Sequence, residues 1–483
     1  MSAPFVNLES YYAFAGKSLS NGQIDPAREI LESSIANPVS SVLGIALITK
    51  IFGFSVLTSR IFSLICACML IIISAWFLLK YYKLNESIIT VLLLIFNPLF
   101  FYYSTVASSD IPFAFLTTSG LIFLIIGLKD NERKYIYTSA LLIAASGLFK
   151  INSFIYAFSA ILILFIIIRD KDRLNIILKY MALSLLPLII FYALPYIKQG
   201  YVIPPHLTRN YRFNSVDNIL LFIPRVISEL YLLSAFSTPF LLMAFLCKLR
   251  NINKKVIAAG SAFALILFLI LNYYWHNYSS IFGEMRLELF DSHPYLFYIL
   301  LIFIFLGLVS LFLFKKIIKD NEVNMPLYIW LLSGIFVGAI TRIADRYMLY
   351  ILFPFIVLSS SVFIKYCKIK GSKIIASIFL LGYALISISY NIIFINEGMA
   401  ASKIADYINK NNIPIYYNPG KDSGSVLCHN WYLIRGDLLR KKAGAYKYSL
   451  DTITGSSDKN ILYKKDVKLL GVKIKSYAII KNK

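Results

Sequence analysis

The chain has 483 residues, of which 58% are hydrophobic, and its mean hydropathy is +0.70. This composition excludes a soluble multidomain protein, because the apolar runs repeatedly reach the length that crosses a bilayer. The formal net charge of +23 does not indicate a nucleic-acid partner, since many Lys and Arg residues lie in short connections between apolar runs. We therefore predict a multi-pass membrane protein.

Cysteine and histidine usage predicts neither a disulfide framework nor a metal site. The five Cys are scattered, with Cys66 and Cys68 inside one apolar run. The four His include no pair at metal-ligand spacing. We expect no metal and no cofactor.

Residues 1–56 do not form a span, because charged residues such as Glu9, Asp25 and Glu32 interrupt every apolar run. The pattern predicts an acidic segment on the outer face that carries short helices lying on the membrane. One helix is expected around Leu8 to Leu19, and another from Val39 to Phe52, ending at Gly53.

About twelve apolar runs of membrane length follow. They lie at 57–80, 87–104, 110–128, 135–150, 152–168, 173–194, 226–247, 255–275, 293–314, 326–343, 346–365 and 373–395. The expected fold is an all-α membrane domain over 57–395.

The tail, 396–483, is expected to form a small α/β domain. A helix from Met399 to Lys410 precedes a strand-like IPIYY, and the alternating run VKIKSYAII closes the chain.

Alternate connections between the predicted spans are basic, which places all six of them on one side of the membrane. By the positive-inside rule that side is the cytoplasm. The N-terminal segment, the turn at Asp110, Lys150 and the tail are then expected on the outer side of the cell membrane.

Asp110 lies between two long apolar runs, in STVASSDIPFAF. Pro112 favours the first turn of a helix, so the carboxylate is expected near a helix N-terminus at the membrane surface. It is either a helix cap, worth roughly 1 kcal/mol, or a functional acid, because ionisable groups at membrane boundaries are costly.

Cations on the predicted outer side suggest a site for an anion such as a lipid phosphate. Lys150, in GLFKINSF, is either a snorkelling side chain or a ligand. Arg346 either pairs with Asp345 or binds the anion, for which Arg is geometrically suited. His206, in IPPHLTRN, is either solvated or part of the same site.

The order of these features resembles the GT-C glycosyltransferases of the dolichyl-phosphate-mannose protein mannosyltransferase and aminoarabinose transferase type. The matching features run from the N-terminal acid to a late Arg-Tyr followed by a proline. They are Glu9 with Tyr11 and Tyr12, IFGF at 51–54, Arg60, Asp110 with Pro112, GLFK at 147–150, and Arg346 with Tyr347 and Pro354. Together they cover residues 5–365.

The resemblance implies transfer of a sugar from a polyprenyl-phosphate donor to a protein, glycan or lipid acceptor, with inversion at the anomeric carbon. Glu9 or Asp110 would take the proton of the acceptor, while Lys150 and Arg346 would stabilise the phosphate. We also assign Tyr12, Tyr347 and His206 to substrate binding.

Two features depart from the family pattern. The family usually has a span before the first acidic loop, and that loop usually carries Asp-Glu where this chain has Asn7-Leu8-Glu9. We therefore expect an in-frame apolar segment upstream if the start is misassigned.

A multi-pass transporter or lipid-linked-sugar flippase is the alternative function. It predicts charges near the midpoints of spans, whereas here the charges lie at the outer ends.

Overall fold

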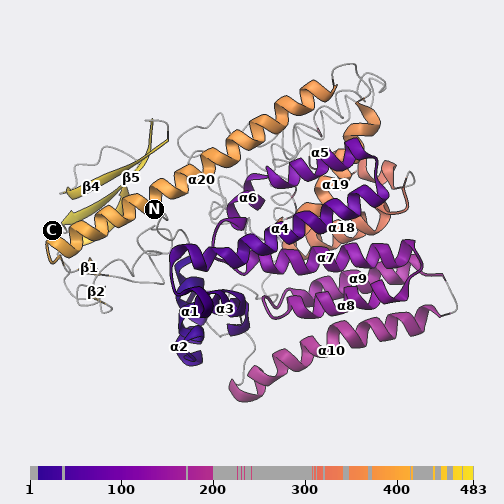
Figure 1. Cartoon of the computed structure of the whole chain (residues 1–483), viewed down its shortest axis with the longest axis horizontal. Helices are drawn as coiled ribbons and strands as arrows, with labels where there is room; N and C mark the ends of the chain where they lie inside the picture. The colour runs from indigo at the N-terminus through magenta and orange to yellow at the C-terminus, as the bar shows by residue number, and fades with distance from the viewer. Residues whose placement is uncertain are drawn as a thin grey trace. The chain divides into compact units, whose positions relative to one another are not determined.

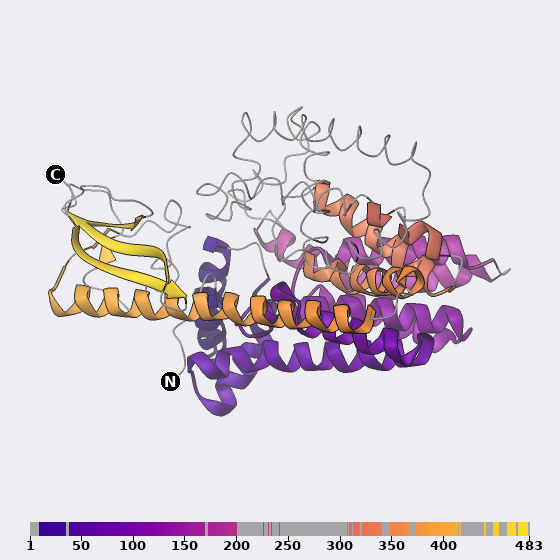
Figure 2. The same ribbon diagram turned by 90° about the horizontal axis from the view of Figure 1, so that it is seen from above.

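The computed structural model describes residues 9–34, 38–169, 172–199, 321–340, 348–367 and 372–413, five strands between 415 and 481, and isolated positions between 226 and 318. The chain divides into two compact units. Unit 1 comprises Met1–Cys66, Phe101–Pro112 and Ala384–Lys483, and unit 2 comprises Ala67–Phe100 and Phe113–Tyr383. Figure 1 and Figure 2 show the elements from two directions.

The N-terminal part of unit 1 is helical. It contains α1 (Glu9–Ser20), α2 (Ile24–Ser34), the short 3₁₀ helix η1 (Val39–Val42) and α3 (Leu43–Phe52). The two predicted helices are confirmed as α1 and as η1 with α3, and α3 ends at Gly53, whose φ of 78° suits glycine. Their position on the membrane surface stays a prediction.

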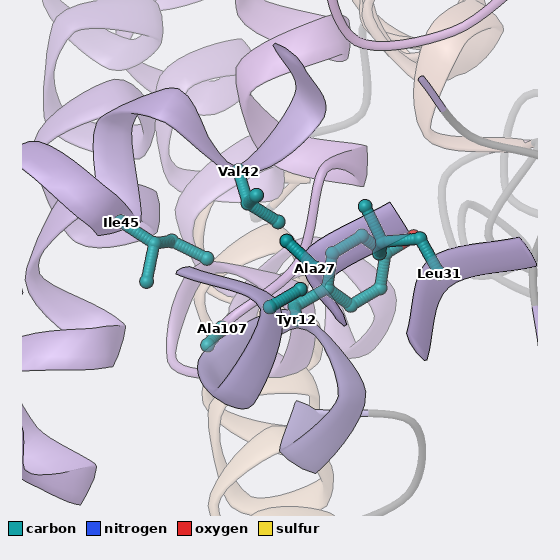
Figure 3. Close-up of a cluster of buried hydrophobic side chains, with 7 residues drawn as sticks. Tyr12, Ala27, Leu31, Val42, Ile45 and Ala107 are labelled. Carbon is teal, nitrogen blue, oxygen red and sulfur yellow. The ribbon is translucent and has the colours of Figure 1, made fainter. Parts of the chain in front are cut away.

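Helix α2 was not predicted, because Asp25, Arg28, Glu29 and Glu32 break its apolar pattern. This helix is stabilised by the burial of two apolar residues on one of its faces. Ala27 and Leu31, four residues apart and both 0% exposed, pack into a cluster with Tyr12, Ala15, Val42, Ile45 and Ala107 (Figure 3). Ala107 belongs to the turn before Asp110, so this cluster holds that turn against the N-terminal helices.

Ten described helices follow α3 along the chain (Figure 1). They are α4 (Val56–Tyr81), α5 (Leu84–Ile95), α6 (Pro98–Ser104), α7 (Asp110–Lys129), α8 (Arg133–Ser146), α9 (Ser153–Ile167), α10 (Arg173–Gln199), α18 (Asn324–Ile340), α19 (Leu349–Tyr366) and α20 (Ser372–Lys410). Within unit 2, α8 packs against α9 and α10, and α18 packs against both α9 and α19.

Five helices among the described residues are long and apolar enough to cross a membrane. They contain the predicted spans at 57–80, 110–128, 173–194, 346–365 and 373–395, apart from a few terminal residues, so a multi-pass membrane protein is confirmed. Three predicted spans, 226–247, 255–275 and 293–314, lie largely outside the described residues. The number of twelve therefore stays a prediction.

The predicted span 87–104 is not one straight helix. Two helices, α5 and α6, replace it and meet at an angle of 58°. Pro98 cannot donate to the preceding turn, and the side-chain oxygen of Asn97 accepts hydrogen bonds from the backbone N–H groups of Leu99 (3.1 Å) and Phe100 (3.2 Å). Asn97 thus caps a new helix that begins with proline.

The predicted break between a span ending at 395 and a helix beginning at Met399 is also wrong, because α20 continues from Ser372 to Lys410. No proline interrupts this stretch, and a single Gly398 costs a helix only about 1 kcal/mol.

After α20, the short β1 (Ile415–Tyr416) pairs in parallel with β2 (Leu439–Arg440). A second, antiparallel sheet has the order β3 (Tyr448–Ile453), β5 (Val472–Lys481), β4 (Ile461–Leu469). The expected strands in IPIYY and VKIKSYAII correspond to β1 and β5. The domain boundaries at 56 and 395 stay predictions.

Polar contacts in unit 2 connect five of the six basic connections at one end of the helices. They are Lys80 with Asp130, Lys129 with Glu322, Arg133 with Asp172 (2.7 Å), and the Lys365 ammonium donating to the Lys316 carbonyl (3.3 Å). The hydrogen bond from Lys80 is the main reason that the pKa of Asp130 lies below its ordinary value. Exposed pairs of this kind contribute little stability, but they show that these connections share one end.

We predict that Cys residues placed at Glu132 and Glu322 react with a membrane-impermeant thiol reagent from the same side of the membrane. The experiment uses a variant whose five native Cys are replaced, in intact cells and in inverted vesicles. Labelling of the two positions from opposite sides would contradict the placement of these connections at one end of the helices.

Candidate functional site

Glu9 is the first residue of α1, and its carboxylate forms a buried, two-pronged ion pair. Arg60 donates from Nε to Oε1 (2.6 Å) and from Nη2 to Oε2 (2.7 Å). The Glu9 side chain is 1% exposed and that of Arg60 20%. Planar bidentate geometry makes this the strong form of an Arg–carboxylate contact.

The same carboxylate holds the turn before α7. The backbone N–H of Ala107 donates to Glu9 Oε1 (2.8 Å), three residues before Asp110. Glu9 therefore links the start of α1, the first turns of α4 and the Asp110 turn through three hydrogen bonds.

Tyr12, three residues after Glu9 in α1, contacts the same segment before α7. Its hydroxyl lies 3.0 Å from Ser109 Oγ, and the residue is 2% exposed. The backbone N–H of Asp110 donates to Ser108 Oγ (3.3 Å). Tyr12 is thus in contact with the neighbour of Asp110, a placement that the sequence did not indicate.

Asp110 is the first residue of α7 and is 1% exposed. A carboxylate in the first turn is stabilised by the helix dipole without being the cap. Whether Asp110 is a cap or a functional acid stays a prediction.

Replacing Glu9 by Gln is expected to lower the free energy of unfolding by about 2–3 kcal/mol. An amide cannot accept both Arg60 donors, which leaves a largely buried guanidinium without its anion. Chemical unfolding in detergent measures the change. Glu29→Gln, at an exposed position of α2, is the control and should change stability by less than about 0.5 kcal/mol. Equal effects of the two substitutions would contradict a structural role for the pair.

Lys150 lies in unit 2, in the turn between α8 and α9, and is 5% exposed. Helix α8 starts at the ion-paired end, so this turn lies at the opposite end of the helices. The Lys150 ammonium lies 5.5 Å from the centroid of the Tyr350 ring, at the start of α19. Burial of the whole residue is more than snorkelling at a span end would give.

The turn that carries Lys150 is packed tightly against α10. The Tyr192 hydroxyl donates to the Gly147 carbonyl (2.9 Å), and a Cβ at Gly147 would lie 2.1 Å from Leu188 Cδ2. The glycine in GLFK is thus required by the close approach of α10.

Gly147→Ala is expected to destabilise the protein by about 1–3 kcal/mol, because Leu188 must move. Gly382→Ala is the matched control: nothing lies within 4 Å of a Cβ at that position in α20, so it should be neutral or stabilising by up to about 1 kcal/mol. Thermal unfolding of the two variants distinguishes them. A Gly147→Ala variant as stable as the parent would contradict this prediction, because it would mean that Leu188 moves aside without destabilising the protein.

The other predicted substrate-binding residues, Arg346, Tyr347 and His206, lie outside the described residues. Their roles stay predictions. In the part of the chain that the structure describes, no group of three or more His, Cys, Asp or Glu could hold a metal ion.

Sequence reasoning did not assign a site role to Arg60 or Tyr350. Arg60 was noted only as part of the family pattern, and its ion pair with Glu9 depends on a contact across 51 residues. For Tyr350 the sequence carries no signal, because it lies two hundred residues from Lys150.

Residues 37–196 match the family described as dolichyl-phosphate-mannose-protein mannosyltransferase. This range contains Arg60, Asp110 and Lys150. The match confirms the family resemblance drawn from the sequence over these residues, and it gives no support to a transporter. No curated protein sequence matches the chain.

Two solved structures resemble the fold. ArnT from Cupriavidus metallidurans in the apo state gives a TM-score of 0.49 at 10% sequence identity, and the same protein bound to undecaprenyl phosphate gives 0.49 at 11%. Each comparison covers 99% of this chain and 94% of the other.

Proposed function

We propose that this chain, a membrane glycosyltransferase by its match to the mannosyltransferase family, transfers a sugar from a polyprenyl-phosphate donor to a protein, glycan or lipid acceptor. The observation that carries the proposal is that the matched range contains an acid and a cation, Asp110 and Lys150, that are both almost completely buried. Ionisable groups buried at the ends of membrane helices are costly and tend to mark sites.

The donor supplies a phosphate leaving group, and its departure needs positive charge. The bond from the anomeric carbon to the phosphate oxygen breaks as the acceptor oxygen attacks, and the released lipid phosphate gains negative charge. Lys150 stabilises that charge, with Arg346, Tyr347 and His206 as further ligands.

The acceptor must lose a proton, and we assign Asp110 as the base. Both oxygens of the Glu9 carboxylate already accept hydrogen bonds from Arg60 or Ala107. Protonating Glu9 would break the contacts that hold the Asp110 turn. Glu9 and Tyr12 are therefore assigned to positioning Asp110, while the carboxylate of Asp110 receives the proton.

The reaction is assigned to the outer face of the cell membrane. Five basic connections share one end of unit 2, and the positive-inside rule places such an end in the cytoplasm. Lys150 lies at the opposite end of the same helices, and Asp110 lies at the end of α7 opposite Lys129.

Asp110→Asn is expected to lower the rate of sugar transfer by about 10²–10⁴-fold, while expression and membrane insertion stay at the parental level. An amide keeps the size and hydrogen-bonding shape of the residue, but it does not accept a proton near neutral pH. The rate is measured with radiolabelled polyprenyl-phosphate sugars and membranes that contain the variant.

Asp130→Asn is the control, since Asp130 is a carboxylate just past the opposite end of α7. It should leave transfer unchanged. A normal rate for Asp110→Asn would remove Asp110 as the base and return the role to Glu9.

A further inference from the structure

Helix α3, in unit 1, has one buried face and one exposed face, and the exposed face is apolar. On the buried face, Ile45 packs in the cluster that contains Ala107 (Figure 3). On the other face, Leu43, Leu47 and Ile51 follow one another at four-residue intervals and are 48%, 60% and 62% exposed. A row of large apolar side chains left uncovered on one helix indicates an interaction surface.

This exposed face leads directly to a helix that is long and apolar enough to cross a membrane. Helix α4 begins at Val56, and the link of three residues keeps the end of α3 within about 15 Å of that start. The first turns of α4 are also apolar and exposed, at Leu57 and Leu64. The exposed face of α3 therefore lies at the boundary of the membrane that α4 enters.

Two lysines accompany the apolar row. Lys50, in the last turn of α3, is exposed and lies on the same face as Leu47, since positions three residues apart share a helix face. Lys17, in the last turn of α1, is also exposed, and its ammonium lies 4.8 Å from the centroid of the Phe54 ring, in the link between α3 and α4. Lysine stems cover apolar surface while the ammonium groups reach polar surroundings.

The acids of these two helices do not offset that charge. Helix α3 contains no acid, and the one acid of α1, Glu9, is buried in its ion pair with Arg60. The surface formed by the exposed face of α3 together with Lys17 and Lys50 is therefore both apolar and positively charged.

We infer that this surface binds anionic phospholipids of the membrane, with the apolar row in the acyl-chain region and the two ammonium groups at the phosphates. A zwitterionic phospholipid carries its own cation beside the phosphate, whereas an anionic one has net negative charge, so the two lysines favour the anionic kind. The inference does not depend on the proposed sugar transfer.

The test measures lipid contact at α3 itself. Leu47→Cys carries a bimane fluorophore in the full-length protein, with the five native Cys replaced, in nanodiscs that contain equal fractions of doxyl-labelled phosphatidylglycerol or doxyl-labelled phosphatidylcholine. Both lipids should quench the fluorophore. Phosphatidylglycerol should be enriched at this position by about 5-fold, because one lysine near an anionic surface contributes roughly that factor. In 1 M salt the enrichment should disappear, since the Debye length falls to about 3 Å.

Lys17→Gln combined with Lys50→Gln should remove the preference for phosphatidylglycerol and leave quenching by phosphatidylcholine unchanged. The matched control is Lys403→Gln combined with Lys410→Gln, two exposed lysines of α20 in the same unit, which should keep the parental preference. Substitutions at exposed positions of this kind change stability little.

Three results would overturn the inference. Equal quenching by the two lipids in the parent would mean that the surface does not select anionic lipids. A preference that survives in the Lys17 and Lys50 variant would place the selectivity elsewhere. Quenching by neither lipid would mean that lipid does not cover the exposed face of α3.

Discussion

The buried contact between Glu9 and Arg60 is the constraint on which the acidic part of the site depends. It joins the start of α1 to α4 and, through the Ala107 N–H, to the turn that presents Asp110. Removing one partner of such a pair costs more than the pair contributes, because the remaining charge stays buried. We therefore interpret the pair mainly as fixing the position of the turn before Asp110, and less as a net source of stability.

In unit 2 as well, the proposed reacting residue, Lys150, lies in a turn that other residues hold in place. Lys150 would be costly to bury as an isolated cation, yet a neutralised lysine would be a poor phosphate ligand. The Lys150 ammonium lies 5.5 Å from the centroid of the Tyr350 ring. In unit 1, Tyr12 and Glu9 contact Ser109 and Ala107, in the turn that leads to Asp110.

Sequence reasoning succeeded where the signal is local. Long apolar runs predicted the ends of α4 and α7 to within one residue, and those of α10 and α19 to within five, since bilayer thickness sets the length of a span. Asp110 and Lys150 stood out because a single charge between two such runs is costly. Hydropathy did not indicate the bend at Asn97-Pro98, where a cap and a proline outweigh a continuous apolar run. It also did not indicate α2, which is stabilised by the tertiary packing of Ala27 and Leu31.

The roles of Glu9 and Tyr12 could not be separated from that of Asp110 by sequence, because both depend on contacts across about a hundred residues. Spacing alone shows that an acid is present but not what it pairs with. Only the fold shows that both Glu9 oxygens are occupied by Arg60 and the Ala107 N–H.

The central claim is that sugar moves from a lipid phosphate directly to an acceptor. The most direct measurement follows a doubly labelled polyprenyl-phosphate sugar, with ³H in the sugar and ³²P in the phosphate, incubated with membranes that contain the protein. The account predicts that one lipid phosphate is released for each sugar transferred, with the ³²P remaining on the lipid. Movement of the intact lipid-linked sugar across the membrane, with no release of lipid phosphate from any donor tested, would contradict it.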